Sequence, residues 1–189
     1  YVPCARNFVI TITDGEPTYD RNLPASIEGY YPTYTDGSAY VPPWAGPNPP
    51  NYFWYNPNYG SHYIDDITLY AHVDIANHKY RDLRSDLAGN QNITFYFVYA
   101  AFGKASPDGR RLLQQAARNG GFEDMNGNFL PDLTKEYDKN GDGVPDTYFE
   151  AQNGDELTSS LVSAITDILR RTSSGTAVSI LSTSAHGEG

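Results

Sequence analysis

Two acidic, asparagine-rich segments contain the residue types and spacing that could do chemistry in this sequence. Residues 124–132 are Asp-Met-Asn-Gly-Asn-Phe-Leu-Pro-Asp and residues 138–146 are Asp-Lys-Asn-Gly-Asp-Gly-Val-Pro-Asp, an internal repeat with a spacing of 14 residues. Both fit D-x-N-x-[DN]-x-x-x-D, which puts side-chain oxygens at positions 1, 3, 5 and 9 and a backbone carbonyl at position 7. Ca²⁺ takes roughly six to eight oxygen ligands in flexible geometry, and a tight turn supplies them from one short segment. We therefore predict two calcium loops.

The two loops differ in their charge. The predicted ligands are Asp124, Asn126, Asn128, the Leu130 carbonyl and Asp132 in the first loop, and Asp138, Asn140, Asp142, the Val144 carbonyl and Asp146 in the second. Three carboxylates against two predict tighter binding at the second loop, where Gly143 also replaces the bulky Phe129. The alternative is a pair of Asn/Gly/Asp turns that bind no ion.

These loops are not helix-loop-helix EF-hands. Position 12, where an EF-hand places a bidentate glutamate, is Lys135 in the first loop and Phe149 in the second. The missing ligands could come from Glu123, Glu136, Asp155 or water. The expected affinity lies in the extracellular range, roughly 10⁻⁴ M or a few decades tighter, with one or two ions bound.

A second candidate site is Asp14, in Thr-Asp-Gly-Glu-Pro at the end of the β-branched run 7–13. Ligands of an open α/β sheet bind at the carboxyl ends of its strands, so Asp14 is placed where a metal or a polar ligand would be met. A turn aspartate that caps the following segment explains the same residue equally well.

Strand and helix patterns alternate along the chain, which favours an α/β fold with a parallel sheet. Strands buried on both faces are predicted over 7–13 and 93–102, and a short strand over 147–151. The Ser/Thr/Gly-rich tail from 172 is either a linker or contains a strand at 177–181. An amphipathic helix is predicted over 62–80. Two more helices have start signals, one at Ser106-Pro107 that ends at Gly120-Gly121, and one at Asn153 and Glu156 with Arg170 and Arg171 in its last turn.

Composition restricts the function further. A formal net charge of −10 argues against a nucleic-acid binder, and no apolar run approaches the roughly 20 residues of a membrane span. The single cysteine, Cys4, cannot form an intrachain disulfide. Eight of the 13 prolines and both tryptophans lie within 19–60, a segment too long for an ordinary connection. We interpret it as an insertion that packs on itself or forms an interface.

Other candidates are weaker. The three histidines at 62, 72 and 78 lack i, i+4 spacing on one helix face and are expected to be surface residues. The sequon at Asn92 opens a predicted buried strand and is discounted. No G-x-S-x-G, H-E-x-x-H, P-loop or dinucleotide fingerprint occurs, so a hydrolase is the least favoured function.

Several segments together resemble a known family. Residues 4–18, Cys-Ala-Arg-Asn-Phe-Val-Ile-Thr-Ile-Thr-Asp-Gly-Glu-Pro-Thr, resemble the strand and third metal-site loop of a von Willebrand factor A domain, in the form found in the PilY-type tip adhesin and assembly protein of bacterial type IV pili. The resemblance continues in 63–68, 89–94, 112–121, 148–151 and 155–175. It covers most of the chain outside the insertion, and its specificity comes from the order and spacing of the segments.

The resemblance implies a Rossmann-like sheet with a metal-ion-dependent adhesion site. That site combines a D-x-S-x-S loop, a threonine loop and an aspartate loop, and only the aspartate loop, with Asp14, occurs here. We expect residues 1–175 to be the later portion of such a domain, with insertions at 19–60 and at the calcium loops 122–147, and residues 176–189 to start a following segment. Mg²⁺ or Ca²⁺ would bind near Asp14 if upstream segments supply the other ligands.

The expected function is that of an extracellular, pilus-associated and non-enzymatic calcium-binding adhesion module on a bacterial surface. Its expected partners are pilus or filament proteins, host or surface ligands and the remainder of its own polypeptide, but neither nucleic acid nor a membrane span. The alternative is a structural subunit or packed fragment of an extracellular filament.

Overall fold

The computed structural model describes residues 6–15, 24, 26–27, 63–103 and 105–184. The predicted insertion over 19–60 lies almost wholly outside the described residues. Among the helices of the described part, none is long and apolar enough to cross a membrane.

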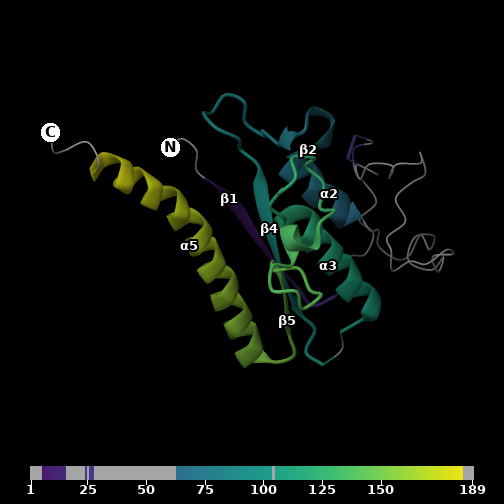
Figure 1. Cartoon of the computed structure of the whole chain (residues 1–189). Helices are drawn as coiled ribbons and strands as arrows, with labels where there is room; N and C mark the ends of the chain where they lie inside the picture. Colours follow the sequence, from purple (N-terminus) through teal and green to yellow (C-terminus); the bar gives the residue numbers. More distant parts are fainter. Residues whose placement is uncertain (1–5, 16–23, 25, 28–62, 104, 185–189) are drawn as a thin grey trace.

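A three-stranded parallel sheet forms the centre of the molecule (Figure 1). Its strands are β1 (Asn7–Thr13), β4 (Ile93–Ala100) and β5 (Tyr148–Ala151), in the order β1-β4-β5. Asn7 pairs with Ile93 at the start of the first ladder, and Ala100 pairs with Ala151 at the end of the second. The three strands and the parallel α/β arrangement that the sequence predicts are therefore confirmed.

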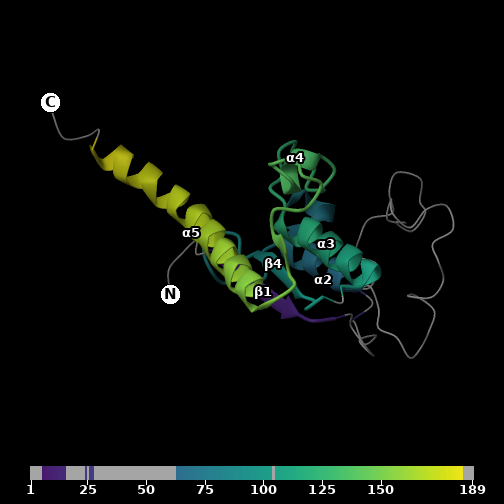
Figure 2. The ribbon, with the colours of Figure 1, turned by 90° about the horizontal axis from the view of Figure 1, so that it is seen from below.

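Helices cover both faces of this sheet. Helices α2 (Tyr63–His72) and α3 (Pro107–Gly121) pack against each other on one face, and α5 (Gly154–Ser184) lies on the other (Figure 2). The short helix α4 (Thr134–Tyr137) belongs to the segment between α3 and β5. Parallel sheets need this double cover because both of their faces are apolar.

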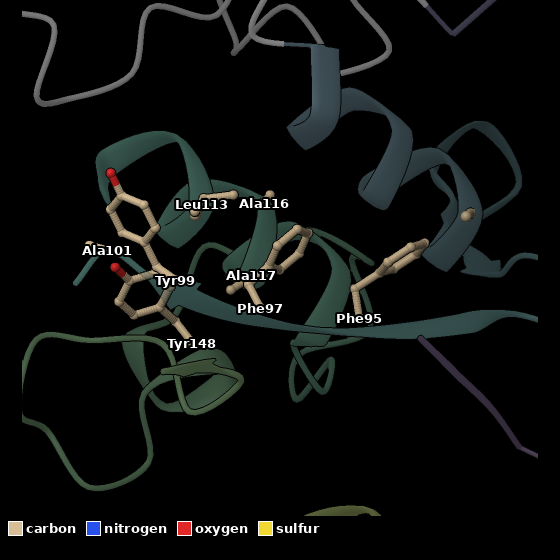
Figure 3. Close-up of a cluster of buried hydrophobic side chains, with 9 residues drawn as sticks. Phe95, Phe97, Tyr99, Ala101, Leu113, Ala116, Ala117 and Tyr148 are labelled. Atoms are coloured by element: carbon tan, nitrogen blue, oxygen red, sulfur yellow. The ribbon is translucent and has the colours of Figure 1, made fainter. Parts of the chain in front are cut away.

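The main core lies between β4 and α3 (Figure 3). Its buried members are Phe95, Phe97, Tyr99 and Ala101 from β4 and the residue after it, Leu113, Ala116 and Ala117 from α3, Ala71 from α2, and Tyr148 from β5. The alternate residues of β4, Tyr96 and Val98, are completely buried on the face toward α5. Strand β4 is thus buried on both faces, as its continuous apolar run predicts.

Strand β1 differs from its prediction. The sequence indicates burial on both faces, but Val9 is 38% exposed and Ile12 is 52% exposed. The reason is that β1 lies at the edge of the described sheet, where β4 is its sole neighbour among the described strands. An apolar run specifies that a strand can be buried, whereas the neighbouring elements decide whether it is.

Helix α2 is shorter than the predicted helix over 62–80. It ends at His72, and the chain turns through β2 (Val73–Asp74), the 3₁₀ turn η2 (Ile75–Asn77) and β3 (Lys79–Tyr80). Arg81 secures this end, because its backbone N–H donates to the His72 carbonyl and its Nε donates to the Tyr70 carbonyl at 2.6 Å. These donors replace the helical hydrogen bonds that would otherwise continue the helix.

Both predicted helix starts are confirmed. Ser106 Oγ accepts the backbone N–H of Gly109 at 3.3 Å at the start of α3. At α5, Asn153 Oδ1 accepts the Glu156 N–H at 3.0 Å, and the Asn153 side-chain amide donates to Glu156 Oε1 at 2.7 Å. Asparagine and serine are favoured at these positions because they satisfy backbone groups of the first turn.

The end of α5 is further along the chain than the sequence predicts. The helix runs through the predicted strand at 177–181 to Ser184, so that strand is wrong, and Arg170 and Arg171 lie inside the helix rather than in its last turn. Extending an existing helix fixes one residue per added hydrogen bond, whereas a new strand needs a partner.

The close approach of α3 to its neighbours depends on glycine and gives a testable prediction. A Cβ added at Gly120 would lie 2.8 Å from Thr68 Cβ and 2.9 Å from Phe95 Cδ2. Gly120→Ala should therefore lower the free energy of unfolding by about 1–3 kcal/mol, measured by urea denaturation. The control is Gly154→Ala, where an added Cβ meets nothing within 4 Å. Equal stability of the two variants would contradict the packing described here.

Candidate metal centre

The two predicted calcium loops lie between the end of α3 and the start of β5. The first loop follows Gly121 and the second loop precedes Tyr148, with α4 between them. This segment is located at the amino-terminal end of β5, because β5 begins where the second loop ends. Asp14 follows the last residue of β1 and is therefore at the opposite, carboxyl-terminal end of the parallel sheet. The two candidate metal sites are separate.

In the first loop, side-chain oxygens at positions 1, 3 and 5 accept backbone N–H groups. Asp124 accepts from Gly127 and Phe129, each at 3.0 Å. Asn126 Oδ1 accepts from Asn128 at 3.1 Å, and Asn128 Oδ1 accepts from Leu130 at 2.8 Å. The side chains at the three positions thus turn into the loop, as the predicted ligand pattern requires.

The second loop repeats this hydrogen bonding. Asp138 accepts from Gly141 at 2.8 Å and from Gly143 at 2.9 Å, Asn140 Oδ1 accepts from Asp142 at 2.9 Å, and Asp142 Oδ1 accepts from Val144 at 2.8 Å. Asp146, at position 9, accepts the Lys139 N–H at 3.2 Å. Each bond except the last has its counterpart 14 residues earlier in the chain.

The backbone of the two loops is also the same at the positions that set the turn. Position 4 has a positive φ in both loops, 81° at Gly127 and 75° at Gly141. Position 6 is likewise positive, 58° at Phe129 and 86° at Gly143. Glycine adopts this region without steric cost, whereas Phe129 is strained there. The sequence repeat is therefore a structural repeat, and the first loop keeps the conformation despite its unfavourable residue.

Phe129 is held in place by packing. Its ring stacks edge-on against Tyr80 with centroids 5.4 Å apart, and it packs on the small cluster of Leu69, Val73 and Phe122. This contact anchors the first loop to α2, to the β2–β3 hairpin and to the end of α3. The second loop has no such ring at position 6, which leaves it the less strained of the two.

The side chains at positions 3, 5 and 9 of the first loop meet one another. The amide of Asn126 donates to Asp132 Oδ1 at 3.0 Å, and the amide of Asn128 donates to Asp132 Oδ2 at 2.7 Å. In the second loop, the Asn140 amide donates to Asp142 Oδ2 at 2.9 Å. In the first loop these bonds bring the side chains at positions 3, 5 and 9 together, and in the second loop the bond joins positions 3 and 5, which groups oxygen-bearing side chains as a shared ion would require.

These groups fit Ca²⁺ better than a transition metal. All of them are oxygens of carboxylate, amide and carbonyl groups, the ligands that hard cations prefer. Among the described residues, no three His, Cys, Asp or Glu side chains are arranged to hold a metal ion. The predicted calcium ligands differ from such a cluster, because they include asparagine side chains and backbone carbonyls as well as carboxylates.

The second loop shows electrostatic strain that a cation would relieve. Burial, together with the charge of Asp138, raises the pKa of Asp146 against the opposing hydrogen bond from the Lys139 N–H. Asp138 itself is only 2% exposed. Two carboxylates in one small, partly buried loop repel each other, and a bound divalent cation would compensate their charge.

The three additional acidic ligands suggested by the sequence have other positions. Glu136 is buried and accepts the N–H groups of Met125 at 2.9 Å and Leu133 at 3.1 Å. Its carboxylate therefore holds the two ends of the first loop together. Glu123 pairs with Lys139 and Arg171. Asp155 is beyond the far end of β5, whose four residues span about 13 Å. Water is the remaining source of ligands.

Arginine and lysine side chains attach the loops to the rest of the fold. Arg118 of α3 donates to the Pro131 carbonyl and stacks over Tyr137, 4.7 Å from the ring centroid. Lys139 Nζ lies 2.8 Å from Glu123, and Arg171 of α5 lies 2.9 Å from the same carboxylate. Position 2 of the second loop is therefore connected to α5 through one glutamate.

The chain of ion pairs continues into the core. Arg171 pairs with Asp167 at 2.7 Å, and the hydroxyl of the buried Tyr96 donates to the same carboxylate at 2.6 Å. Arg170 also pairs with Asp167. The sequence did not predict this network, because its members are separated by up to 75 residues. The i, i+4 spacing of Asp167 and Arg171 on one helix is the one signal that could have indicated part of it.

Asp14 is exposed at the carboxyl end of β1, as the sequence predicts. Its turn is closed by the neighbouring Thr13, whose Oγ1 accepts the Gly15 N–H at 3.3 Å. The described part of the chain contains no group of acidic, His or Cys side chains that completes a metal site with Asp14. A site at this position remains a prediction that depends on ligands from other segments.

His72 is not the surface residue that the sequence predicts. It is 2% exposed, with Nδ1 2.8 Å from the Ile93 carbonyl and Nε2 2.9 Å from the Phe122 carbonyl. Burial lowers the pKa of His72, although both carbonyl contacts oppose this effect. Through its two carbonyl contacts, His72 links α2 to β4 and to the end of α3. His78 is exposed, as expected, and His62 lies outside the described residues.

Comparisons with protein-family models, with curated proteins and with solved structures give no match for this chain. The candidate site is therefore supported by its own geometry and by the sequence pattern.

The ion-pair network predicts a specific pH dependence. Burial opposes ionisation of Asp167, but the bonds from Tyr96, Arg171 and Arg170 lower its pKa from 3.8 to about 2. Because the pKa of Asp167 is lower in the folded than in the unfolded protein, its ionised carboxylate stabilises the fold above pH 3.8. This contribution is lost as the pH falls toward about 2. Asp167→Asn should cost about 1–3 kcal/mol at neutral pH and flatten the stability curve in that window.

The measurement is urea denaturation as a function of pH, and the control is Asp155→Asn. Asp155 is an exposed acid in the first turn of the same helix, so its neutralisation should cost about 0.5 kcal/mol or less. A D167N protein with the wild-type acid profile would show that the network contributes nothing to stability.

Proposed function

We propose that this chain is a calcium-binding module in which two tandem loops order the segment between α3 and β5. The observation that carries this proposal is the structural repeat. Two segments 14 residues apart share the same positive-φ positions and the same inward side-chain bonds, although one has Phe129 where the other has Gly143. A pair of unrelated turns would not need to retain a strained phenylalanine at that position.

Calcium would act here mainly through structure. The segment contains no regular secondary structure apart from α4. Its 23 residues 124–146 include five aspartates at predicted ligand positions, Asp124, Asp132, Asp138, Asp142 and Asp146. Two ions would bring the formal net charge from −10 to −6. Weak sites of this kind are occupied where calcium is abundant, which supports an extracellular location.

We further propose an adhesive, pilus-associated role on the bacterial surface, with pilus or filament proteins and host or surface ligands as partners. This part of the proposal rests on the resemblance of the sequence to the von Willebrand factor A domains of PilY-type proteins. The parallel α/β sheet is compatible with the Rossmann-like fold that this resemblance implies. The aspartate loop at Asp14 would contribute to adhesion if other segments complete its metal site.

A binding role is proposed rather than a catalytic one. Catalysis by a nucleophile needs a base within hydrogen-bond reach of a hydroxyl or thiol. His72, the buried histidine of the described part, has both ring nitrogens against backbone carbonyls, and neither is directed at a serine, threonine or cysteine.

The alternative function is that of a packed subunit of an extracellular filament. A specific observation favours it, because Val162, Ile165 and Leu169 form an apolar stripe on the outer face of α5 and are 59%, 49% and 61% exposed. Such stripes commonly pack against other chains. Helical polymers of the purified protein in electron micrographs would favour this function over a monomeric adhesin.

Calcium titration tests the metal-binding proposal. Calorimetry of chelator-treated protein should show saturable binding, and calcium at 100 times Kd should stabilise the fold by about 2.7 kcal/mol. Asp138→Asn combined with Asp142→Asn should remove most of the heat, whereas Asp124→Asn should remove less because the second loop has more carboxylates.

The matched control for these variants is Asp86→Asn, an exposed acid paired with Arg84 outside the loops. It should bind calcium like the wild type. If the chelator-treated wild-type protein shows neither heat nor a thermal shift on addition of calcium, the loops are turns without an ion, whatever the variants do.

Cell binding tests the adhesive proposal. The labelled protein should bind piliated bacterial cells in calcium and lose most of that binding in chelator, because calcium orders the loops. The double variant D138N/D142N should bind weakly in both buffers, and D86N should behave as the wild type. Equal binding of all proteins to piliated and pilus-free cells would contradict a pilus-associated role.

A further inference from the structure

A cavity of about 410 Å³ lies at the amino-terminal end of the sheet, apart from the ligand positions of the second calcium loop. Its walls come from the starts of β1 and β4, from the end of α2 and from β3. The remaining wall consists of α5 and the segment that joins α3 to the first loop. This volume falls in the range of small-molecule sites.

The cavity has an unusual charge for so acidic a protein. Three arginines, Arg6, Arg170 and Arg171, line it, against the two carboxylates Glu123 and Asp124. Arg171 is only 6% exposed and is fixed in place by its ion pairs with Asp167 and Glu123. In the described part of the chain, Arg6 makes no ion pair. Asp167 and Glu123 already compensate the charge of Arg171, so Arg6 is the guanidinium that a negatively charged ligand would meet.

Neutral hydrogen-bonding groups surround these charges. The Tyr80 hydroxyl accepts the Asp124 N–H at 3.2 Å and keeps its own hydrogen for a ligand oxygen. Asn7, Asn92 and Thr94 add two amides and a hydroxyl, which both donate and accept. These groups suit a ligand with several hydroxyls.

We propose that this cavity binds a small hydroxylated carboxylate of the size and chemistry of a uronic acid. Arg6 takes the carboxylate, and Tyr80 and Asn92 bind the ring hydroxyls. A single negative charge fits better than a doubly charged phosphate, because Glu123 and Asp124 also face the cavity. This inference goes beyond the calcium-dependent adhesive function and does not require it.

The test uses D-galacturonate, with D-galactose and D-galactose 6-phosphate as matched probes. Amide and side-chain chemical shifts of the labelled protein are followed during each titration. Galacturonate should give saturable shifts at Arg6, Tyr80 and Asn92, galactose should give none, and the phosphate should bind more weakly than galacturonate. Each titration is run with calcium and with chelator, so that a failure of the calcium loops is separated from a failure of the cavity.

Arg6→Gln is the decisive variant, because Arg6 is exposed at the start of β1 and its replacement leaves the core intact. It should weaken galacturonate binding about tenfold or more, since a charge-assisted hydrogen bond is lost. Arg84→Gln, an exposed arginine outside the cavity, should bind like the wild type. The proposal is overturned if galactose binds as well as galacturonate, if the phosphate binds more tightly, if no probe saturates, or if Arg6→Gln has no effect.

Discussion

The burial of β4 on both faces is the constraint on which the rest of the structure depends. Phe95, Phe97 and Tyr99 face α2 and α3, while Tyr96 and Val98 face α5. One strand therefore holds two helical layers, and each layer brings functional residues with it. Helix α3 positions the first predicted calcium loop through Arg118, and α5 positions the second through Arg171 and Glu123. The loops contact the edge of the buried core through Val144 and Phe129.

The electrostatics follow from the same arrangement. The protein is strongly acidic, yet one cation, Arg171, is buried where α5 passes the loop segment. Arg171 is kept charged inside the protein by Asp167 and Glu123, and Tyr96 supplies the further hydrogen bond that a buried carboxylate needs. These pairs join the calcium loops, α5 and the charged cavity into one network. A change at any of the three would be felt at the others.

Features that depend on nearby residues were predicted correctly, whereas features that depend on distant contacts were not. The strands at 7–13, 93–102 and 147–151 and both capped helix starts are confirmed, because periodicity and capping residues act within a few positions. The end of α2 depended on Arg81, which lies outside the helix, and the exposure of β1 depended on how many strands flank it. His72 seemed unremarkable in sequence because its two carbonyl partners are 21 and 50 residues away.

The sequence by itself determined the repeated turn of the two loops, since oxygen side chains at fixed short spacing and glycine at a positive-φ position are local properties. It also determined the parallel α/β class. Only the tertiary structure decided that Phe129 tolerates its strained backbone by packing on Tyr80, that Glu123 and Glu136 are committed to other bonds, and that Asp14 lies at the opposite end of the sheet. The physical reason is that these outcomes depend on contacts between distant segments, which residue spacing does not encode.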